Sequence, residues 1–323
     1  MNKPIEIRVH PSQFPSAVSK ELVRSLRARA INPKFHYESY KQTRKWLALH
    51  QAYSPSRSDA DCAAIYDAAF AATASKCAGA SVHLVGLGCG GGQKDTRLLK
   101  LLAGPGRTLF YTPLDVSPAM VQVAALTARE VVPGSRPVVA DLQLATDLGS
   151  MLHSEPADTT LYTFLGMIPN FEPEMILPRL REMVRANDHL LFSANLAPGP
   201  DYKGGVERVV PLYNNELTRD WLMTLPLDLG FEAGDGEMGW EIEGSPFLRI
   251  TAYLKLHRDR TIWFDSEEIL FRSGESLRLF FSYRYAPRLI VDLLARHDLR
   301  VEQQWITKSE EEGVFLCRST RPG

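Results

Sequence analysis

Glycines and two aspartates, each at the end of an apolar segment, are the residues most able to do chemistry. The run Val85-Gly86-Leu87-Gly88-Cys89-Gly90-Gly91-Gly92 follows a short apolar segment, and glycines there let the backbone approach a ligand closely. Asp115 ends the next apolar segment, where a carboxylate could accept hydrogen bonds from both hydroxyls of a ribose. Asp141, followed by Leu142, comes after the third and could bond the exocyclic amine of an adenine. The pattern indicates a nucleoside cofactor.

The glycine run alone leaves alternatives open. Gly86, Gly88 and Gly91 also fit the G-x-G-x-x-G pattern of dinucleotide-binding proteins, and glycines can simply form a tight turn. The second acid, Asp141, and a hairpin at the end of the chain suit S-adenosylmethionine better than a dinucleotide.

Alternating strands and helices must position these residues. Apolar runs predict strands over 81–87, 108–114, 136–140, 159–165 and 189–195, and helices over 60–74, 94–102, 118–130 and 173–185. A helix over 286–297 and a strand pair over 299–306 and 313–319 complete the series. Repeated strand–helix units predict a parallel sheet covered on both faces. The predicted fold is α/β, a Rossmann-like class I methyltransferase sheet with an inserted α+β substrate lobe.

The regular alternation of strands and helices stops after Asn195, and this break gives the predicted domain boundaries. Residues 197–280 are rich in aromatics, glycines and alternating runs. We therefore predict a cofactor domain over 60–199 and 284–323 and an inserted substrate lobe over 200–283. Residues 1–59, read as helical pieces broken by Pro33 and Pro55, should join that lobe.

Composition restricts the classes of protein. The formal net charge is −1 and 45% of the residues are hydrophobic, so the chain lacks the basic excess of a nucleic-acid binder. No run approaches the roughly 20 apolar residues of a membrane span, and the first residues lack a signal-peptide core. Four cysteines without metal-site spacing suit reduced thiols in the cytoplasm.

Several motifs resemble one family, the histidine Nα-methyltransferases of ergothioneine biosynthesis with their fungal dimethylallyltryptophan N-methyltransferase relatives. The similar motifs are Pro33-Lys34-Phe35-His36-Tyr37-Glu38, Tyr53-Ser54-Pro55-Ser56-Arg57, Gly88 to Thr96, Leu165-Gly166-Met167-Ile168-Pro169-Asn170-Phe171 and Tyr213-Asn214-Asn215-Glu216-Leu217. The likeness extends from about Asn32 to Cys317. It implies a monomer or weak homodimer that methylates a nitrogen of a small molecule.

The resemblance also implies a cofactor site. The residues that fall on matching positions, or on the glycine turn itself, are Gly88, Gly90, Lys94, Asp115, Asp141 and Leu142. Lys94 could equally be a solvated lysine. One departure is Gly86, which stands where the family carries an acid.

On the substrate side the match is partial. Asn170 matches the asparagine that holds the substrate carboxylate, Tyr37 a tyrosine near the amino group, and Ser282 a serine that touches the imidazole. Tyr53 and Tyr213 lie in matching motifs, and Tyr202 is the best candidate for the second carboxylate ligand. Departures are Ser54 for a tyrosine, Phe280 for the imidazole-binding glutamate, and Ala252 for a methionine.

These departures remove partners for an imidazole, and an unpaired buried polar group costs about 1–3 kcal/mol. The sequence therefore predicts an acceptor that is more apolar or aromatic than histidine, in secondary metabolism. Histidine methylation, and a catalytically silent member that only binds the cofactor, stay open. So do structural roles for Tyr37 in the core and for Asn170 as a turn cap.

Overall fold

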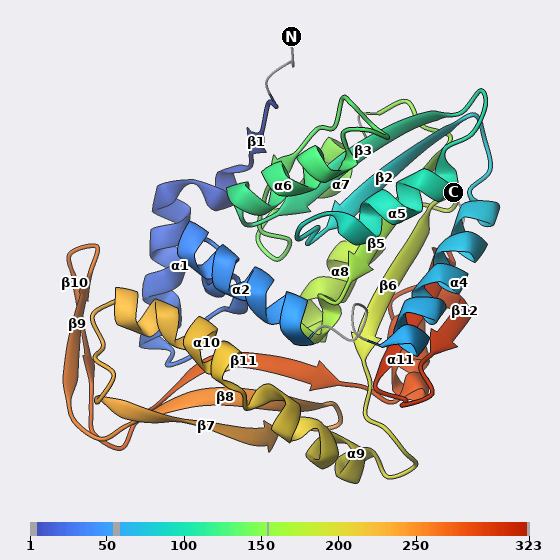
Figure 1. Ribbon diagram of the computed structural model, residues 1–323. Helices are drawn as coiled ribbons and strands as arrows, with labels where there is room; N and C mark the ends of the chain where they lie inside the picture. The colour runs from blue at the N-terminus through green and yellow to red at the C-terminus, as the bar shows by residue number, and fades with distance from the viewer. Residues whose placement is uncertain (1–4, 54–58, 154, 322–323) are drawn as a thin grey trace. The chain divides into compact units, whose positions relative to one another are not determined.

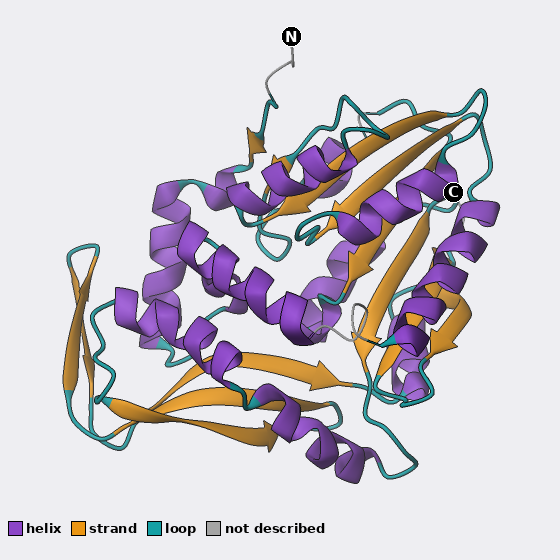
Figure 2. Ribbon diagram, viewed as in Figure 1, coloured by secondary structure: helices purple, strands orange, loops and turns teal. Residues whose placement is uncertain are grey.

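The computed structural model describes residues 5–53, 59–153 and 155–321. The chain forms two compact units. The large unit comprises Met1–Gln13, Pro55–Leu196 and Tyr285–Gly323, and the small unit Phe14–Ser54 and Ala197–Arg284. Figures 1 and 2 show their elements. Each predicted boundary lies a few residues from a boundary of these units, but residues 1–13 fall in the large unit and not with the substrate lobe.

The large unit is built on an eight-stranded sheet in the order β1-β4-β3-β2-β5-β6-β13-β12. Neighbouring strands are parallel except that β13 runs antiparallel to both β6 and β12. This order, with its reversed seventh strand, confirms the predicted class I methyltransferase sheet. The strands are β1 (Arg8–Val9), β2 (Ser81–Leu87), β3 (Thr108–Asp115), β4 (Val138–Val139), β5 (Thr159–Leu165), β6 (His189–Asn195), β12 (Leu299–Ile306) and β13 (Glu312–Ser319).

Helices bury the central strands of this sheet. The apolar residues of β2 are buried without alternation, as expected of a parallel strand that is covered on both faces. Helices α4, α5 and α6 pack in a row, and α5 and α6 lie against β2 and β3. The helices are α4 (Ala60–Lys76), α5 (Gln93–Leu102), α6 (Pro118–Ala128), α7 (Leu148–Leu152), α8 (Pro173–Met183) and α11 (Pro287–Ala295).

Local signals in the sequence explain where these helices begin. The side chain of Asp59 caps α4 by accepting from the backbone N–H groups of Asp61 and Cys62. Ser117 caps α6 in the same way, and Pro118 occupies the first helical position. None of the helices in the described ranges is both long and apolar enough to cross a membrane.

The N-terminal strand differs from the sequence interpretation. Residues 1–59 were expected to be helical, yet Arg8 and Val9 pair in parallel with Val138 and Val139 and extend the edge of the large sheet. The N–H group of Arg8 donates to the carbonyl of Pro137, and that of His10 to the carbonyl of Val139. These bonds pair the outer edge of the short strand β4.

The small unit is an antiparallel sheet in the order β11-β8-β7, with a separate β9–β10 hairpin. Its helices α2 and α10 pack against each other. Periodicity in the sequence indicated strands here but not α9 or α10. The elements are α1 (Pro15–Arg27), η2 (Pro33–His36), α2 (Tyr40–Tyr53), α9 (Tyr202–Val209), η4 (Val210–Tyr213), α10 (Glu216–Asp228), β7 (Gly236–Glu243), β8 (Leu248–Leu256), β9 (Arg260–Phe264), β10 (Glu267–Phe271) and β11 (Ser276–Arg284).

Candidate functional site

A left-handed glycine turn joins β2 to α5. Gly88, Gly90 and Gly92 have φ angles of 62°, 50° and 72°, a region that side chains other than glycine rarely adopt. At Gly88 a Cβ atom would also lie 2.6 Å from Cγ of Met167. The glycine is therefore needed both for the turn and for the close approach of Met167.

Asp115 at the end of β3 faces this turn. Its Oδ2 accepts the N–H of Gly90 at 3.3 Å, and its Oδ1 accepts the N–H of Ser117 at 3.0 Å. Burial raises the pKa of Asp115 to about 6, against the lowering effect of these backbone hydrogen bonds. A carboxylate can accept about four hydrogen bonds, so Asp115 keeps acceptor capacity for two ligand hydroxyls.

Asp141 follows β4 at the same edge of the sheet. Its Oδ1 accepts the N–H groups of Gln143 at 2.8 Å and Leu144 at 3.3 Å, and its own N–H donates to Oγ of Ser12 at 3.1 Å. Leu142 is buried beside it. These contacts stabilise the turn that carries the predicted adenine-binding residues.

Lys94, in the first turn of α5, packs on a tyrosine. Its Nζ donates to Oη of Tyr66 at 2.9 Å and lies 4.1 Å from the centre of the Tyr66 ring. Burial lowers the pKa of Lys94, and the nearby Glu312 opposes that shift. The structure thus gives Lys94 defined partners at the glycine turn, unlike a solvated surface lysine.

Gly86 is explained by a second acid that the sequence analysis did not single out. A Cβ atom at Gly86 would lie 2.1 Å from Oδ2 of Asp95. The Asp95 carboxylate is buried and accepts hydrogen bonds from the hydroxyls of Tyr111 at 2.8 Å and Thr163 at 2.7 Å. An acid is therefore present beside the end of β2, although α5 supplies it.

Asn170 lies at the end of η3 (Ile168–Asn170), after β5. Its backbone N–H donates to the carbonyl of Met167 at 3.0 Å. Its segment therefore follows directly on the residue that touches Gly88.

In the small unit, three predicted or neighbouring residues share one face of the sheet. Phe280 on β11 and Trp240 on β7 both pair with Ala252 on the central strand β8. Phe280 also packs edge-on against Trp221 of α10, with ring centres 5.5 Å apart. Ala252 has no exposed surface. The position that the family resemblance assigns to an imidazole-binding glutamate is therefore occupied by an aromatic ring that packs against a second one.

Further along this face, Tyr213 contacts Ser282. The Tyr213 hydroxyl donates to Oγ of Ser282 at 2.9 Å and accepts from Nε of Arg284 at 3.1 Å. Tyr202 is tied differently, because its hydroxyl donates to the Arg284 carbonyl at 2.6 Å and accepts from the N–H of Leu248 at 2.8 Å. These two hydrogen bonds hold α9 to the ends of β8 and β11.

The remaining predicted substrate residues lie in the N-terminal part of the small unit. Tyr37 follows η2 and packs against Trp46 and Trp221, with ring centres 5.9 and 5.2 Å away. Tyr53 ends α2 and is 53% exposed. Ser54 lies outside the described residues.

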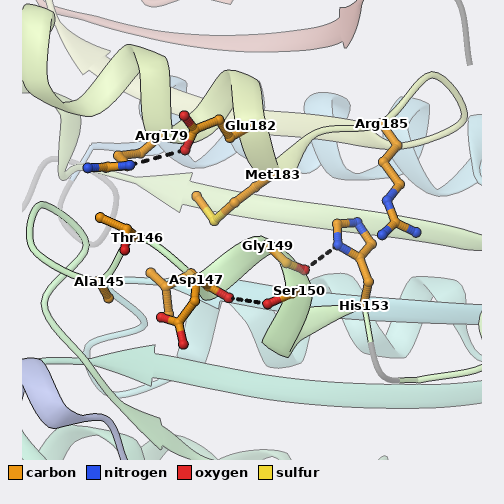
Figure 3. A pocket seen from close by; sticks show the side chains of 11 residues that line it. Ala145, Thr146, Asp147, Gly149, Ser150, His153, Arg179, Glu182, Met183 and Arg185 are labelled. Carbon is orange, nitrogen blue, oxygen red and sulfur yellow. Dashed lines mark hydrogen bonds and ion pairs between the residues drawn. The ribbon is translucent and has the colours of Figure 1, made fainter.

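A cavity of about 370 Å³ lies elsewhere in the large unit, between α7 and α8 (Figure 3). His153, Arg179, Glu182 and Arg185 line it. None of the predicted site residues does so, and we do not assign the cofactor to it. In the described ranges, no cluster of His, Cys, Asp and Glu could hold a metal ion, and all four cysteines are free thiols.

The glycine turn and Asp115 fit S-adenosylmethionine. The backbone of the turn carries no side chain at Gly88 and Gly90, whose φ angles are positive, and the Asp115 carboxylate lies beside it with acceptor capacity to spare. Sheet order and site together define a class I S-adenosylmethionine-dependent methyltransferase.

Comparison with known proteins narrows this class. Residues 18–217 and 244–319 match the family described as histidine-specific, S-adenosylmethionine-dependent methyltransferases. The chain belongs to this family. No curated protein matches the sequence.

Three solved structures that match this chain are distant from it in sequence. The CcbJ methyltransferase of Streptomyces caelestis is 12% identical, with a TM-score of 0.40, and the match covers 80% of this chain and 90% of that one. Magnesium protoporphyrin IX methyltransferase from Synechocystis PCC 6803, with bound S-adenosylhomocysteine, is 12% identical, with a TM-score of 0.47 and coverages of 88% and 98%. The 1,6-didemethyltoxoflavin-N1-methyltransferase of Burkholderia thailandensis is 12% identical, with a TM-score of 0.44 and coverages of 87% and 89%.

Four residues around the site were missed by the sequence analysis: Tyr66, Asp95, Ser193 and Glu312. Only Asp95 had a usable signal, since it lies just past a glycine run that lacks its usual acid. The other three come from segments far apart in the sequence, and only the folded sheet brings them together.

Proposed function

We propose that the acceptor is the nitrogen of a small amine or amino acid whose side chain is more apolar or aromatic than histidine, in a secondary-metabolite pathway. The observation that carries this proposal is Phe280. It lies opposite Ala252 and against Trp221, at the position where the family resemblance implies an imidazole-binding carboxylate.

The proposed cofactor site lies in the large unit. Gly88 and Gly90 would let the backbone approach the cofactor, Asp115 would accept the ribose hydroxyls, and Asp141 with Leu142 would bind the adenine. Lys94 would face the carboxylate of the methionine end. When bound, S-adenosylmethionine supplies a methyl group on a sulfonium sulfur.

On the acceptor side, the chain mainly positions the reactant and excludes water, which can supply most of the rate of a methyl transfer. We propose that Tyr37 orients the amine and that Asn170 holds a carboxylate when the acceptor is an amino acid. The aromatic face around Phe280 would take an apolar side chain. An imidazole there would lose a hydrogen-bond partner, which costs about 1–3 kcal/mol.

The experiment is a competition assay read by mass spectrometry. The purified chain is incubated with S-adenosylmethionine and a mixture of the proteinogenic amino acids and common aromatic amines. We expect a methyl gain on tryptophan or another apolar amine and none on histidine. Methylated histidine would overturn the proposed specificity but leave the methyltransferase assignment intact. If the chain bound S-adenosylhomocysteine and gave no product even with an extended amine panel, the silent-member alternative would replace this proposal.

A variant tests the role of Phe280 directly. Phe280→Glu in an Ala252→Met background should gain histidine methylation and lose methylation of the apolar acceptor. Trp263→Glu is the matched control. It also replaces an aromatic residue on a strand of the small unit by a glutamate, but the Trp263 side chain is 67% exposed. Phe280→Gln, which adds no buried charge, serves if the glutamate variant does not fold. Unchanged acceptor preference in all variants would show that Phe280 does not contact the acceptor.

A further inference from the structure

Tyr66 of α4 connects three polar groups beside the glycine turn. It has no exposed surface. Its hydroxyl accepts a hydrogen bond from Nζ of Lys94 at 2.9 Å and donates one to the carboxylate of Glu312, at the start of β13. A buried phenol therefore links the Lys94 cation on helix α5 to the Glu312 carboxylate on strand β13.

The same hydroxyl also reaches the loop after β5 indirectly, through Ser193 on β6. Oη of Tyr66 lies 2.8 Å from Oγ of Ser193, and Oγ of Ser193 accepts the N–H of Gly166 at 2.8 Å. A phenol has one proton, and the charged Glu312 attracts it most strongly. The Ser193 hydroxyl therefore donates its own proton to Oη of Tyr66. Gly166 precedes Met167, the residue that touches Gly88. Tyr66 thus connects Lys94, which follows the glycine turn, with the segment that carries Met167.

Charge supports this arrangement. Burial raises the pKa of Tyr66 well above its usual range, and Glu312 raises it further, so Tyr66 stays a neutral phenol. The Glu312 carboxylate opposes the effect of burial on Lys94. An ammonium has three protons to donate, so Lys94 can bond Tyr66 and still offer two protons to a ligand.

We propose that Tyr66 and Glu312 are positioning residues, which hold the Lys94 ammonium at the glycine turn to receive the carboxylate of the cofactor's methionine end. This inference rests on the proposed role of Lys94. Neither residue touches the cofactor; both act through Lys94.

The test compares two ligands that differ in the group recognised. S-adenosylhomocysteine carries the aminocarboxylate group, and 5′-methylthioadenosine shares the adenosine but lacks it. Dissociation constants are measured by titration calorimetry for the wild type, Tyr66→Phe and Glu312→Gln. We expect each variant to bind S-adenosylhomocysteine about tenfold more weakly, the effect of losing one hydrogen bond to a charged group. Binding of 5′-methylthioadenosine should change less than about twofold.

Matched controls separate positioning from general damage. Tyr162→Phe makes the same change at another wholly buried tyrosine, whose hydroxyl bonds the Met183 carbonyl. Glu310→Gln removes an exposed carboxylate two residues from Glu312. Both controls should bind both ligands as the wild type does. Lys94→Met should show the full loss of S-adenosylhomocysteine affinity. Adding Tyr66→Phe to Lys94→Met should weaken binding no further, because Tyr66 acts on the ligand only through Lys94.

Equal weakening of both ligands, or no weakening of either, would overturn the inference while leaving the cofactor site itself intact. If the wild type bound neither ligand, the proposed cofactor site would fail and this inference with it. Glu312→Gln changes a half-buried side chain without changing its size, so it decides the matter if Tyr66→Phe does not fold.

Discussion

Replacing Gly86 by alanine would put a methyl group where the Asp95 carboxylate already lies. The new Cβ would be 2.1 Å from Oδ2 of Asp95 and 3.2 Å from Cβ of Cys89. Ordinary contact begins near 3.4 Å, so the carboxylate would have to retreat by more than an ångström. The hydroxyls of Tyr111 and Thr163 hold it in place.

The magnitude follows from these contacts. Inserting a methyl group into a packed interior costs about 1–3 kcal/mol, and a hydrogen bond lost from a carboxylate adds roughly 1.5–3 kcal/mol. With one of these hydrogen bonds broken, we expect Gly86→Ala to lower the free energy of unfolding by about 2.5–6 kcal/mol. Denaturant unfolding followed by circular dichroism measures this difference.

Two further variants make the test specific. Gly104→Ala is the control, since a Cβ there meets nothing within 4 Å, and it should be neutral or slightly stabilising. Asp95→Ala in the Gly86→Ala background removes the clash, so the loss in the double variant should be smaller than the sum of the single losses by at least about 1 kcal/mol. A Gly86→Ala protein as stable as Gly104→Ala, or strictly additive losses, would refute the reasoning.

Three further predictions concern single polar groups. Asp115→Asn should weaken S-adenosylhomocysteine binding about tenfold; since burial raises the pKa of Asp115 to about 6, wild-type affinity should also fall below about pH 6, and calorimetry that shows no such fall contradicts the ribose role. Burial likewise raises the pKa of Asp95 from 3.8 to about 6, so the folded state binds that proton more tightly and stability should decrease as pH rises from about 4 to 6. Asp95→Asn should remove roughly 3 kcal/mol of this decrease. If the free energy of unfolding changed equally between pH 4 and pH 7 in the variant and the wild type, the decrease would not come from Asp95. Tyr202→Phe leaves the Arg284 carbonyl and the Leu248 N–H without their hydroxyl partner, so stability should fall by about 1–3 kcal/mol with S-adenosylhomocysteine binding unchanged; intact stability with a raised KM for the acceptor would instead favour an acceptor-binding role.

The sequence by itself determined every strand of the large sheet except β1, and the edge at which Asp115 and Asp141 lie. Continuous apolar runs bounded by turn residues located β2, β5 and β6 to the residue, because a buried parallel strand leaves no polar alternation to confuse the pattern. The glycine turn, Asp115 and Asp141 could also be predicted, since each follows its strand directly in the sequence.

Only the tertiary structure decided what surrounds these residues. Tyr66, Ser193 and Glu312 come from a helix and two strands whose pairing brings them together, and no local spacing encodes such a contact. In the same way Gly86 looked like a missing acid until α5 placed the Asp95 carboxylate over it. The helices α9 and α10 were not predicted because Gly204, Gly205 and Pro226, which have low helix propensity, lie inside them. Burial of their apolar residues outweighed that local preference. Periodicity reports which residues face a core, but the identity of the neighbour across that core is set by the fold.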